Sequence, residues 1–134
     1  MATLRCVRGW PGAGKSTFAR KTWPSILLLE NDMYLESDGT YKWSKERVKE
    51  AIAWCVETTR NALEHNFDVV VANTFTKARY VMAYKKIAEE CGAKFEVYRC
   101  IGDFKNTHGL SDSMVQNFKN AMEDWPGEVI VEPT

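Results

Sequence analysis

The sequence has 134 residues, a length that suits one domain with its own apolar core, so we expect a single domain over residues 1–134. Hydrophobic residues make up 45% of the chain and charged residues 27%, which excludes disordered, collagen-like and membrane-embedded proteins. The formal net charge is zero, which counts against a dedicated nucleic-acid-binding protein, and the lack of a long apolar run predicts a cytoplasmic chain with no membrane partner.

Strand-like and helix-like patterns alternate in the first third of the chain. Residues 3–8 form the first predicted strand, and residues 15–21 form the helix that follows it. The short apolar run at 26–29 predicts a second strand that is buried on both faces. Residues 33–43 hold a Ser-Asp-Gly turn signal in a polar stretch and predict an exposed loop.

The rest of the chain repeats the alternation. Ser44 is the expected N-cap of a long helix that ends at 66–68, and the expected apolar stripe of this helix is Val48, Ile52, Cys55, Val56, Thr59 and Leu63. The further predicted strands cover 69–72, 94–101 and 129–131, and the further helices cover 78–91 and 111–122. Apolar side chains at helical spacing are expected to pack in the core, and they include Val48, Ile52, Val56, Val81, Ile87 and Phe118. Five strands and four helices in strict alternation indicate an α/β protein with a parallel sheet.

A phosphate-binding motif lies between the first predicted strand and the first helix. Residues 9–16 read Gly-Trp-Pro-Gly-Ala-Gly-Lys-Ser and satisfy G-x-x-x-x-G-K-[ST] in full. The glycines let the backbone curl so that amide groups point at phosphates, and the helix N-terminus adds its positive dipole end. Lys15 can reach the β and γ phosphates, and Ser16 can offer its hydroxyl to Mg²⁺.

The motif therefore predicts ATP (or GTP) and Mg²⁺ as cofactors, with Ser16 as the metal ligand. The residues expected to contact the nucleotide are Pro11, Gly12, Ala13, Gly14, Lys15, Ser16 and Thr17. Trp10 has two interpretations, stacking on a ligand or covering the loop as a packing aromatic.

Four segments occur in an order that resembles the polynucleotide-kinase-like branch of P-loop kinases, which includes small bacterial and phage ATP-binding proteins and relatives of zeta toxins. They read RGWPGAGKSTFARK, ENDMY, VVVANTFT and NTHGLS, and the likeness extends to around Trp125. The resemblance implies one P-loop kinase domain, a three-layer αβα sandwich whose five-stranded parallel sheet has the order 2-3-1-4-5. It also implies transfer of the γ-phosphoryl group of ATP to a hydroxyl acceptor, such as a nucleic-acid 5′-hydroxyl.

Asp32 is the carboxylate that both the residues and the resemblance favour for catalysis. It follows the second predicted strand, so we expect it at the carboxyl edge of the sheet, where open α/β folds bind ligands. A carboxylate there can orient the acceptor hydroxyl and accept its proton. The alternative is a turn cap, and Glu30 and Asp38 are weaker candidates for the same task.

Two positions depart from the pattern of the relatives. Asn73 and Thr74 follow the third predicted strand, where the relatives commonly have Asp-Thr-Asn and an acidic residue holds Mg²⁺ through water. We assign both to acceptor binding, with a purely structural amide as the alternative for Asn73. Leu35 stands where the relatives place an arginine for the acceptor's phosphate, so we assign Arg79 to the substrate site. A solvated surface charge is the alternative for Arg79 and for the other flanking basic residues, Lys42, Lys45 and Lys77.

The segment 102–110 resembles the lid of the relatives, in which an arginine reaches over the phosphates, but it contains no arginine. Lys105 is therefore assigned to catalysis as the lid cation, with His108 as the alternative.

Three functions stay open at this point. The first is a kinase for a hydroxyl of nucleic acid or a nucleotide-like acceptor, the second is a kinase for a metabolite, nucleoside or antibiotic, and the third is a nucleotide-binding switch without phosphotransfer. The order of the motifs favours the first, and the neutral net charge favours the second. A candidate base at Asp32 argues against the third. The sequence makes no prediction of oligomeric state.

Overall fold

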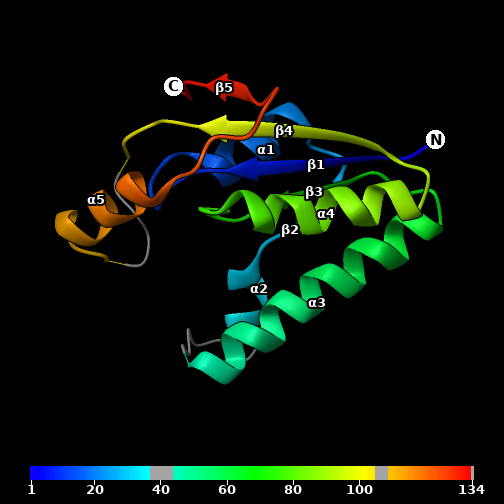
Figure 1. Ribbon diagram of the computed structural model, residues 1–134, viewed down its shortest axis with the longest axis horizontal. Helices are drawn as coiled ribbons and strands as arrows, with labels where there is room; N and C mark the ends of the chain where they lie inside the picture. The colour runs from blue at the N-terminus through cyan, green and yellow to red at the C-terminus, as the bar shows by residue number, and fades with distance from the viewer. Residues whose placement is uncertain (37–43, 105–108, 134) are drawn as a thin grey trace.

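The computed structural model describes residues 1–36, 44–104 and 109–133. These residues form a parallel sheet of five strands in the order β2-β3-β1-β4-β5, which confirms the expected architecture (Figure 1). The strands are β1 (Thr3–Arg8), β2 (Leu27–Leu29), β3 (Val69–Ala72), β4 (Lys94–Cys100) and β5 (Val129–Val131). The helices are α1 (Lys15–Thr22), α2 (Asn31–Leu35), α3 (Lys45–Glu64), α4 (Ala78–Glu90) and α5 (Asp112–Ala121).

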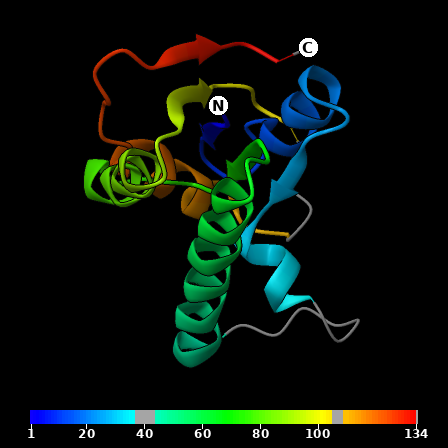
Figure 2. The same cartoon turned by 90° about the vertical axis from the view of Figure 1, so that its right-hand side faces the viewer.

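The sheet is covered on both faces, which gives the three layers of an αβα sandwich. Leu4 and Val71 face α3 and α4 and belong to the larger apolar cluster. Val7 and Val70 belong to a second cluster that includes Ala19 of α1. Figure 2 shows α1 on the opposite side of the sheet from α4. Because its strands are buried on both faces, the centre of the sheet reads as continuous apolar runs, as in Val69–Ala72.

The second strand is an edge strand, and the expectation that it is buried on both faces is partly confirmed, since side chains of β2 pack on each face. β2 pairs with β3 through Leu27, Leu28 and Leu29 and lies at one end of the sheet. Leu29 is buried in the larger apolar cluster and Leu28 packs against the second one, whereas Leu27, at the start of the strand, is 43% exposed. An apolar run of four residues predicts a strand, but it does not reveal whether another strand lies on its far side.

The expected exposed loop at 33–43 begins instead as a helix. Asn31–Leu35 forms α2, and Leu35 is buried. The helix arises because Glu30 takes the extended N-cap conformation and the next turn packs on α3. The turn signal at 37–39 lies outside the described residues. With α2, the described part of the chain has one helix more than expected, and two helices follow each other between β2 and β3.

The long helix begins where expected, because the Ser44 side chain accepts a hydrogen bond of 3.1 Å from the Arg47 amide. The expected stripe is partly confirmed, because Cys55, Thr59 and Leu63 are buried whereas Ile52 is 47% exposed. The residues that α3 buries lie four apart: Ala51, Cys55, Thr59 and Leu63. No helix in the described ranges is both long enough and apolar enough to cross a membrane.

The remaining core expectations are partly confirmed. Val81 and Ile87 of α4 are buried as expected, whereas Phe118 of α5 is only partly buried. Figure 1 shows why: α5 lies beyond the carboxyl ends of β1 and β4 instead of along a face of the sheet. The helix therefore stands beside the site that those strand ends form.

Leu4→Ala and Ile52→Ala provide a matched test of this core. Leu4 is fully buried in the central strand, so its truncation should lower the free energy of unfolding by about 2–5 kcal/mol. Ile52 is half exposed, and its truncation should change that free energy by at most about 0.5 kcal/mol. Urea unfolding followed by circular dichroism measures both, and equal losses in the two variants would contradict the assigned core.

Candidate functional site

The P-loop, residues 9–16, connects the central strand β1 to α1. Gly9 is required by close packing, because a Cβ at this position would lie 2.8 Å from the Cys100 carbonyl oxygen. Gly14 has φ 95°, a left-handed conformation that favours glycine, and it forms the N-cap of α1. A Cβ on Gly14 would also lie 3.0 Å from Pro133. The loop is therefore built for close backbone approach, and the N-terminus of α1 directly follows it.

The Lys15 ammonium lies inside the P-loop and is influenced by two of the candidate acidic residues. Its ammonium donates a hydrogen bond of 3.1 Å to the Trp10 carbonyl inside the loop. Burial lowers the pKa of Lys15, while Cys100, Glu30 and Asp32 act in the opposite direction. Glu30 and Asp32 are thus within electrostatic reach of the P-loop lysine.

The end of β3 and the start of α2 are joined by an amide side chain. Asn73 accepts a hydrogen bond of 2.9 Å from the Asn31 amide, and its own side-chain nitrogen donates to Asn31 Oδ1 at 3.4 Å. This contact supports the structural alternative for Asn73, because the side chain fixes the first turn of α2. Asp32 lies in that same turn. The two strand ends therefore place Asp32 at the carboxyl edge of the sheet, as the topology predicts.

The far end of α2 is held by α3 through residues that sequence reasoning missed. Arg47 donates a hydrogen bond of 3.1 Å to the Tyr34 carbonyl, and its guanidinium carbon lies 5.2 Å from the centre of the Tyr34 ring. The Tyr34 hydroxyl donates to Glu50 at 2.7 Å, and its ring contacts Trp54. A five-residue helix has little stability of its own, so these contacts position Asp32 from the other side. The spacing of residues 47, 50 and 54 places them on one face of the helix, and this is the sequence signal that could have identified them.

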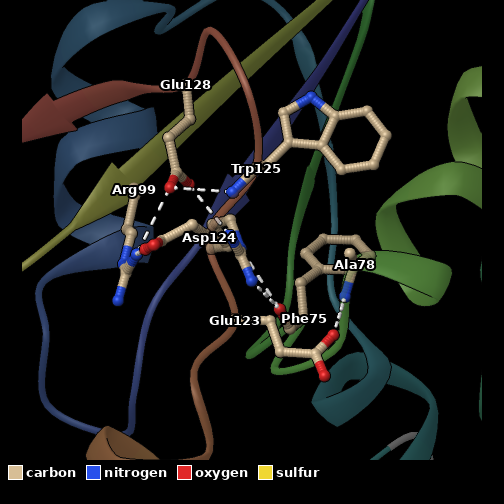
Figure 3. Close-up of polar contacts among 8 residues, drawn as sticks. Phe75, Ala78, Arg99, Glu123, Asp124, Trp125 and Glu128 are labelled. Carbon is tan, nitrogen blue, oxygen red and sulfur yellow. Dashed lines mark hydrogen bonds and ion pairs between the residues drawn. The ribbon is translucent and has the colours of Figure 1, made fainter.

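A buried ionic network supports the turn between β3 and α4 (Figure 3). Arg8, at the end of β1, is fully buried and donates two hydrogen bonds to the Phe75 carbonyl, at 3.1 and 2.6 Å. Its guanidinium also pairs with Glu128 at 2.9 Å. Glu128 accepts further hydrogen bonds from Arg99 at 3.2 Å and from the Trp125 amide at 3.1 Å. Phe75 has φ 47°, so this network holds a strained turn in place.

Backbone hydrogen bonds connect that turn directly to the P-loop. The Gly9 amide donates to the Thr74 carbonyl at 3.3 Å, and the Asn73 amide donates to the Val7 carbonyl at 3.1 Å. Thr74 thus reaches the P-loop through its carbonyl. Arg79 is exposed, and its guanidinium lies 5.3 Å from the centre of the Tyr80 ring. None of the contacts of Arg79 with other described residues reaches the P-loop.

The segment after β4 packs against the outside of the P-loop. Gly102 donates to the Ala13 carbonyl at 3.1 Å, and Phe104 donates to the Gly12 carbonyl at 2.7 Å. Trp10 donates through its indole nitrogen to the Gly102 carbonyl at 2.9 Å. This bond gives Trp10 a packing role, which is one of its two expected interpretations.

Lys119 of α5 is a cation beside the P-loop that the sequence did not indicate. Its ammonium lies 5.1 Å from the centre of the Trp10 ring and 3.5 Å from the Asp103 carboxylate. Lys105 and His108, the expected lid cations, lie outside the described residues. Among the other nucleotide contacts expected, Ala13 is buried, Pro11 and Gly12 are partly buried, and Thr17 is exposed.

Solved structures share this fold at low sequence identity. A candidate kinase from Chloroflexus aurantiacus J-10-fl superposes with a TM-score of 0.74 at 16% identity, covering 99% of this chain and 89% of that one. A sugar kinase from Janibacter sp. HTCC2649 has a TM-score of 0.68 at 14% identity, covering 99% and 85%. A chain of the Pnkp1/Rnl/Hen1 complex has a TM-score of 0.65 at 18% identity, covering 87% and 38%. These likenesses show a P-loop kinase-like fold.

Sequence comparison shows the family. The uncharacterized protein PM0531 of Pasteurella multocida (strain Pm70) is 30% identical over 155 residues, an alignment that covers 99% of this chain and 84% of the relative. The family model AAA_33, described as an AAA domain, matches residues 4–104. That range includes the P-loop, Asp32 and the turn after β3. The chain therefore belongs to the AAA_33 family of AAA domains and has the P-loop kinase-like fold.

Proposed function

We propose that this protein is an ATP-dependent kinase that transfers the γ-phosphoryl group to a hydroxyl acceptor. The observation that carries the proposal is the position of Asp32 in the first turn of α2, directly after β2, at the same edge of the sheet as the P-loop that follows β1. A phosphate-binding cation and a proton-accepting carboxylate are two of the groups that kinases use to transfer a phosphoryl group to an alcohol.

In the proposed reaction, the amides of the P-loop and the Lys15 ammonium bind the phosphates of ATP. Asp32 orients the acceptor hydroxyl toward the γ-phosphorus and accepts its proton as the new P–O bond forms and the bond to ADP breaks. Mg²⁺ would be held by the Ser16 hydroxyl and the phosphate oxygens, where it supplies neutralising charge. Oxygen donors at this position fit the preference of Mg²⁺.

The leading acceptor is a 5′-hydroxyl of nucleic acid, which the order of the sequence motifs and the likeness to a chain of the Pnkp1/Rnl/Hen1 complex support. A small-molecule acceptor is the second candidate. It is favoured by Leu35, whose buried apolar side chain replaces the expected phosphate-binding arginine, and by the zero net charge. A likeness to a sugar kinase supports it as well.

The test is a transfer screen with ATP labelled at the γ-phosphate, using 5′-hydroxyl DNA and RNA, sugars and nucleosides as acceptors. Lys15→Ala should abolish transfer and weaken Mg-ATP binding in calorimetry by about 10- to 100-fold, since a hydrogen bond to a charged group contributes about 1.5–3 kcal/mol. Lys21→Ala, which removes an exposed lysine from the same helix, is the matched control and should leave both unchanged.

Two outcomes, one from the calorimetry and one from the screen, would count against the proposal. Mg-ATP affinity in Lys15→Ala equal to that of wild type would remove the P-loop from nucleotide binding. Tight binding of Mg-ATP by the wild-type protein without transfer to any acceptor would instead favour a nucleotide-dependent switch.

A further inference from the structure

The strand end that carries a metal-directed acid in many P-loop proteins carries an amide here. That position is Asn73, directly after β3. The Asn73 side chain is already committed, because it accepts from the Asn31 amide and donates to the Asn31 side chain. A neutral amide in this arrangement adds no negative charge for a cation. A protein carboxylate for Mg²⁺ at this site would then come from a different residue.

Glu30 lies at the end of the neighbouring strand. β2 pairs directly with β3, so the residues that follow the two strands emerge side by side. Glu30 adopts the extended N-cap conformation of α2, with φ −141° and ψ 144°, but its side chain makes no capping hydrogen bond. Instead, the Ser16 hydroxyl donates a hydrogen bond to the Glu30 carboxylate. The carboxylate is therefore turned away from its own helix and toward the P-loop.

We infer that Glu30 supplies the carboxylate of the Mg²⁺ site, from β2 in place of β3. The inference rests on the proposed nucleotide-dependent function, and it assigns Glu30 to the Mg²⁺ that would bind with the nucleotide. A serine hydroxyl that gives its hydrogen to a carboxylate keeps its oxygen lone pairs for a cation. The carboxylate also adds negative charge and can accept hydrogen bonds from water bound to the metal. Glu30 thus orients the Ser16 oxygen as a metal ligand.

The surroundings agree with a site that is completed by nucleotide. Among the described residues, no three His, Cys, Asp or Glu side chains gather as a metal-binding group. Mg²⁺ is commonly held by one or two carboxylates together with phosphate oxygens, so one serine and one carboxylate beside a P-loop are a sufficient protein contribution. Lys15 lies close enough to be affected by Glu30, which places this carboxylate near the phosphate-binding loop.

Asp32 is the other carboxylate near Lys15, and the two acidic residues have different tasks. The Ser16 hydroxyl bonds to Glu30, whereas Asp32 lies within the first turn of α2. Glu30 therefore acts on the metal and Asp32 on the acceptor hydroxyl. This division predicts that Glu30→Gln weakens metal binding and that Asp32→Asn slows phosphoryl transfer without weakening metal binding.

The experiment measures Mn²⁺ binding to the protein with ADP, by the loss of the free Mn²⁺ signal in electron paramagnetic resonance. Glu30→Gln should weaken Mn²⁺ affinity in the ADP complex by about 10- to 100-fold, the usual effect of losing a group that supports a metal ligand. Asp32→Asn is the matched control and should change it by less than about 3-fold. ADP affinity in the presence of a chelator should be the same in all three proteins.

Further variants separate this inference from the proposed function. Adding Glu30→Gln to Ser16→Ala should weaken Mn²⁺ binding by a smaller factor than Glu30→Gln does in the wild-type background, because part of the effect of Glu30 passes through the Ser16 hydroxyl. Wild-type Mn²⁺ affinity in Glu30→Gln overturns the inference, even where phosphoryl transfer is observed. If Mn²⁺ affinity falls only in Asp32→Asn, the inference is also overturned, and Asp32 is then the carboxylate that supports the metal. Weaker Mn²⁺ binding in Glu30→Gln without any transfer by the wild-type protein supports the metal site and rejects the kinase.

Discussion

Asp32→Asn is expected to lower the rate of phosphoryl transfer by about 10²- to 10⁴-fold while Mg-ATP affinity stays close to that of wild type. Asparagine keeps the size of the side chain but cannot take up the proton of the acceptor. Asp32 lies on α2, between the contact of Asn31 with Asn73 and the contact of Tyr34 with Arg47, so the substitution should leave the backbone in place. Steady-state kinetics on the acceptor found by the screen, together with calorimetry, measures both quantities.

A capping role for Asp32 predicts a different result. The N-cap of α2 is Glu30, and asparagine caps a helix about as well as aspartate. Transfer near the wild-type rate in Asp32→Asn would therefore remove Asp32 from the chemistry. Glu36→Gln, at the exposed C-cap of the same helix, is the control for a change of charge and should leave the rate unchanged.

Glu128→Leu is expected to lower the free energy of unfolding by about 3–5 kcal/mol, because it leaves the charge of a buried partner without compensation. That partner is Arg8, whose side chain is fully buried and whose remaining acceptor among the described residues is the Phe75 carbonyl. Arg99 also loses an ion pair, although it keeps Asp124 at 2.7 Å. Urea unfolding of the variant and of the wild-type protein measures the difference.

A double variant shows whether the buried charge is the cause. Arg8→Met combined with Glu128→Leu should recover a large part of the stability, since an apolar pair of similar volume is often as stable as a buried ion pair. Lys77→Met breaks an exposed pair, Lys77 with Glu123 at 3.9 Å, and should cost less than about 1 kcal/mol. A double variant no more stable than Glu128→Leu would attribute the loss to packing.

Much of the fold could be predicted because its signals are local. The P-loop motif occupies eight consecutive residues, and the apolar runs of β1 and β3 have the length and flanking turns of buried strands. The strand order follows from the resemblance, and the sheet confirms it. Helix α2 could not be predicted, since five residues with a polar start carry almost no periodic signal and depend on contacts with α3.

The residues of the site could be predicted only where a local motif or a place after a strand indicates the role of a single residue. Lys15 and Ser16 are specified by the motif, and Asp32 by its place after a strand. The partners of these residues depend on pairs that are distant in sequence. Ser16 and Glu30 are 14 residues apart, Asn31 and Asn73 are 42 apart, and Arg8 and Glu128 are 120 apart. No local pattern relates such residues, and only the packing of strand ends brings them together.

The separation of Arg8 and Glu128 also has a consequence for how the protein folds. The central strand β1 comes first in the sequence, but its sheet partners and the acid that compensates Arg8 come later, up to 120 residues away. Contacts across such long loops are costly in chain entropy and slow to form. We therefore expect the pairing of Arg8 with Glu128, which supports the turn beside the P-loop, to form late in folding. A chain in which Glu128 has not yet paired with Arg8 would contain the phosphate-binding sequence without this support.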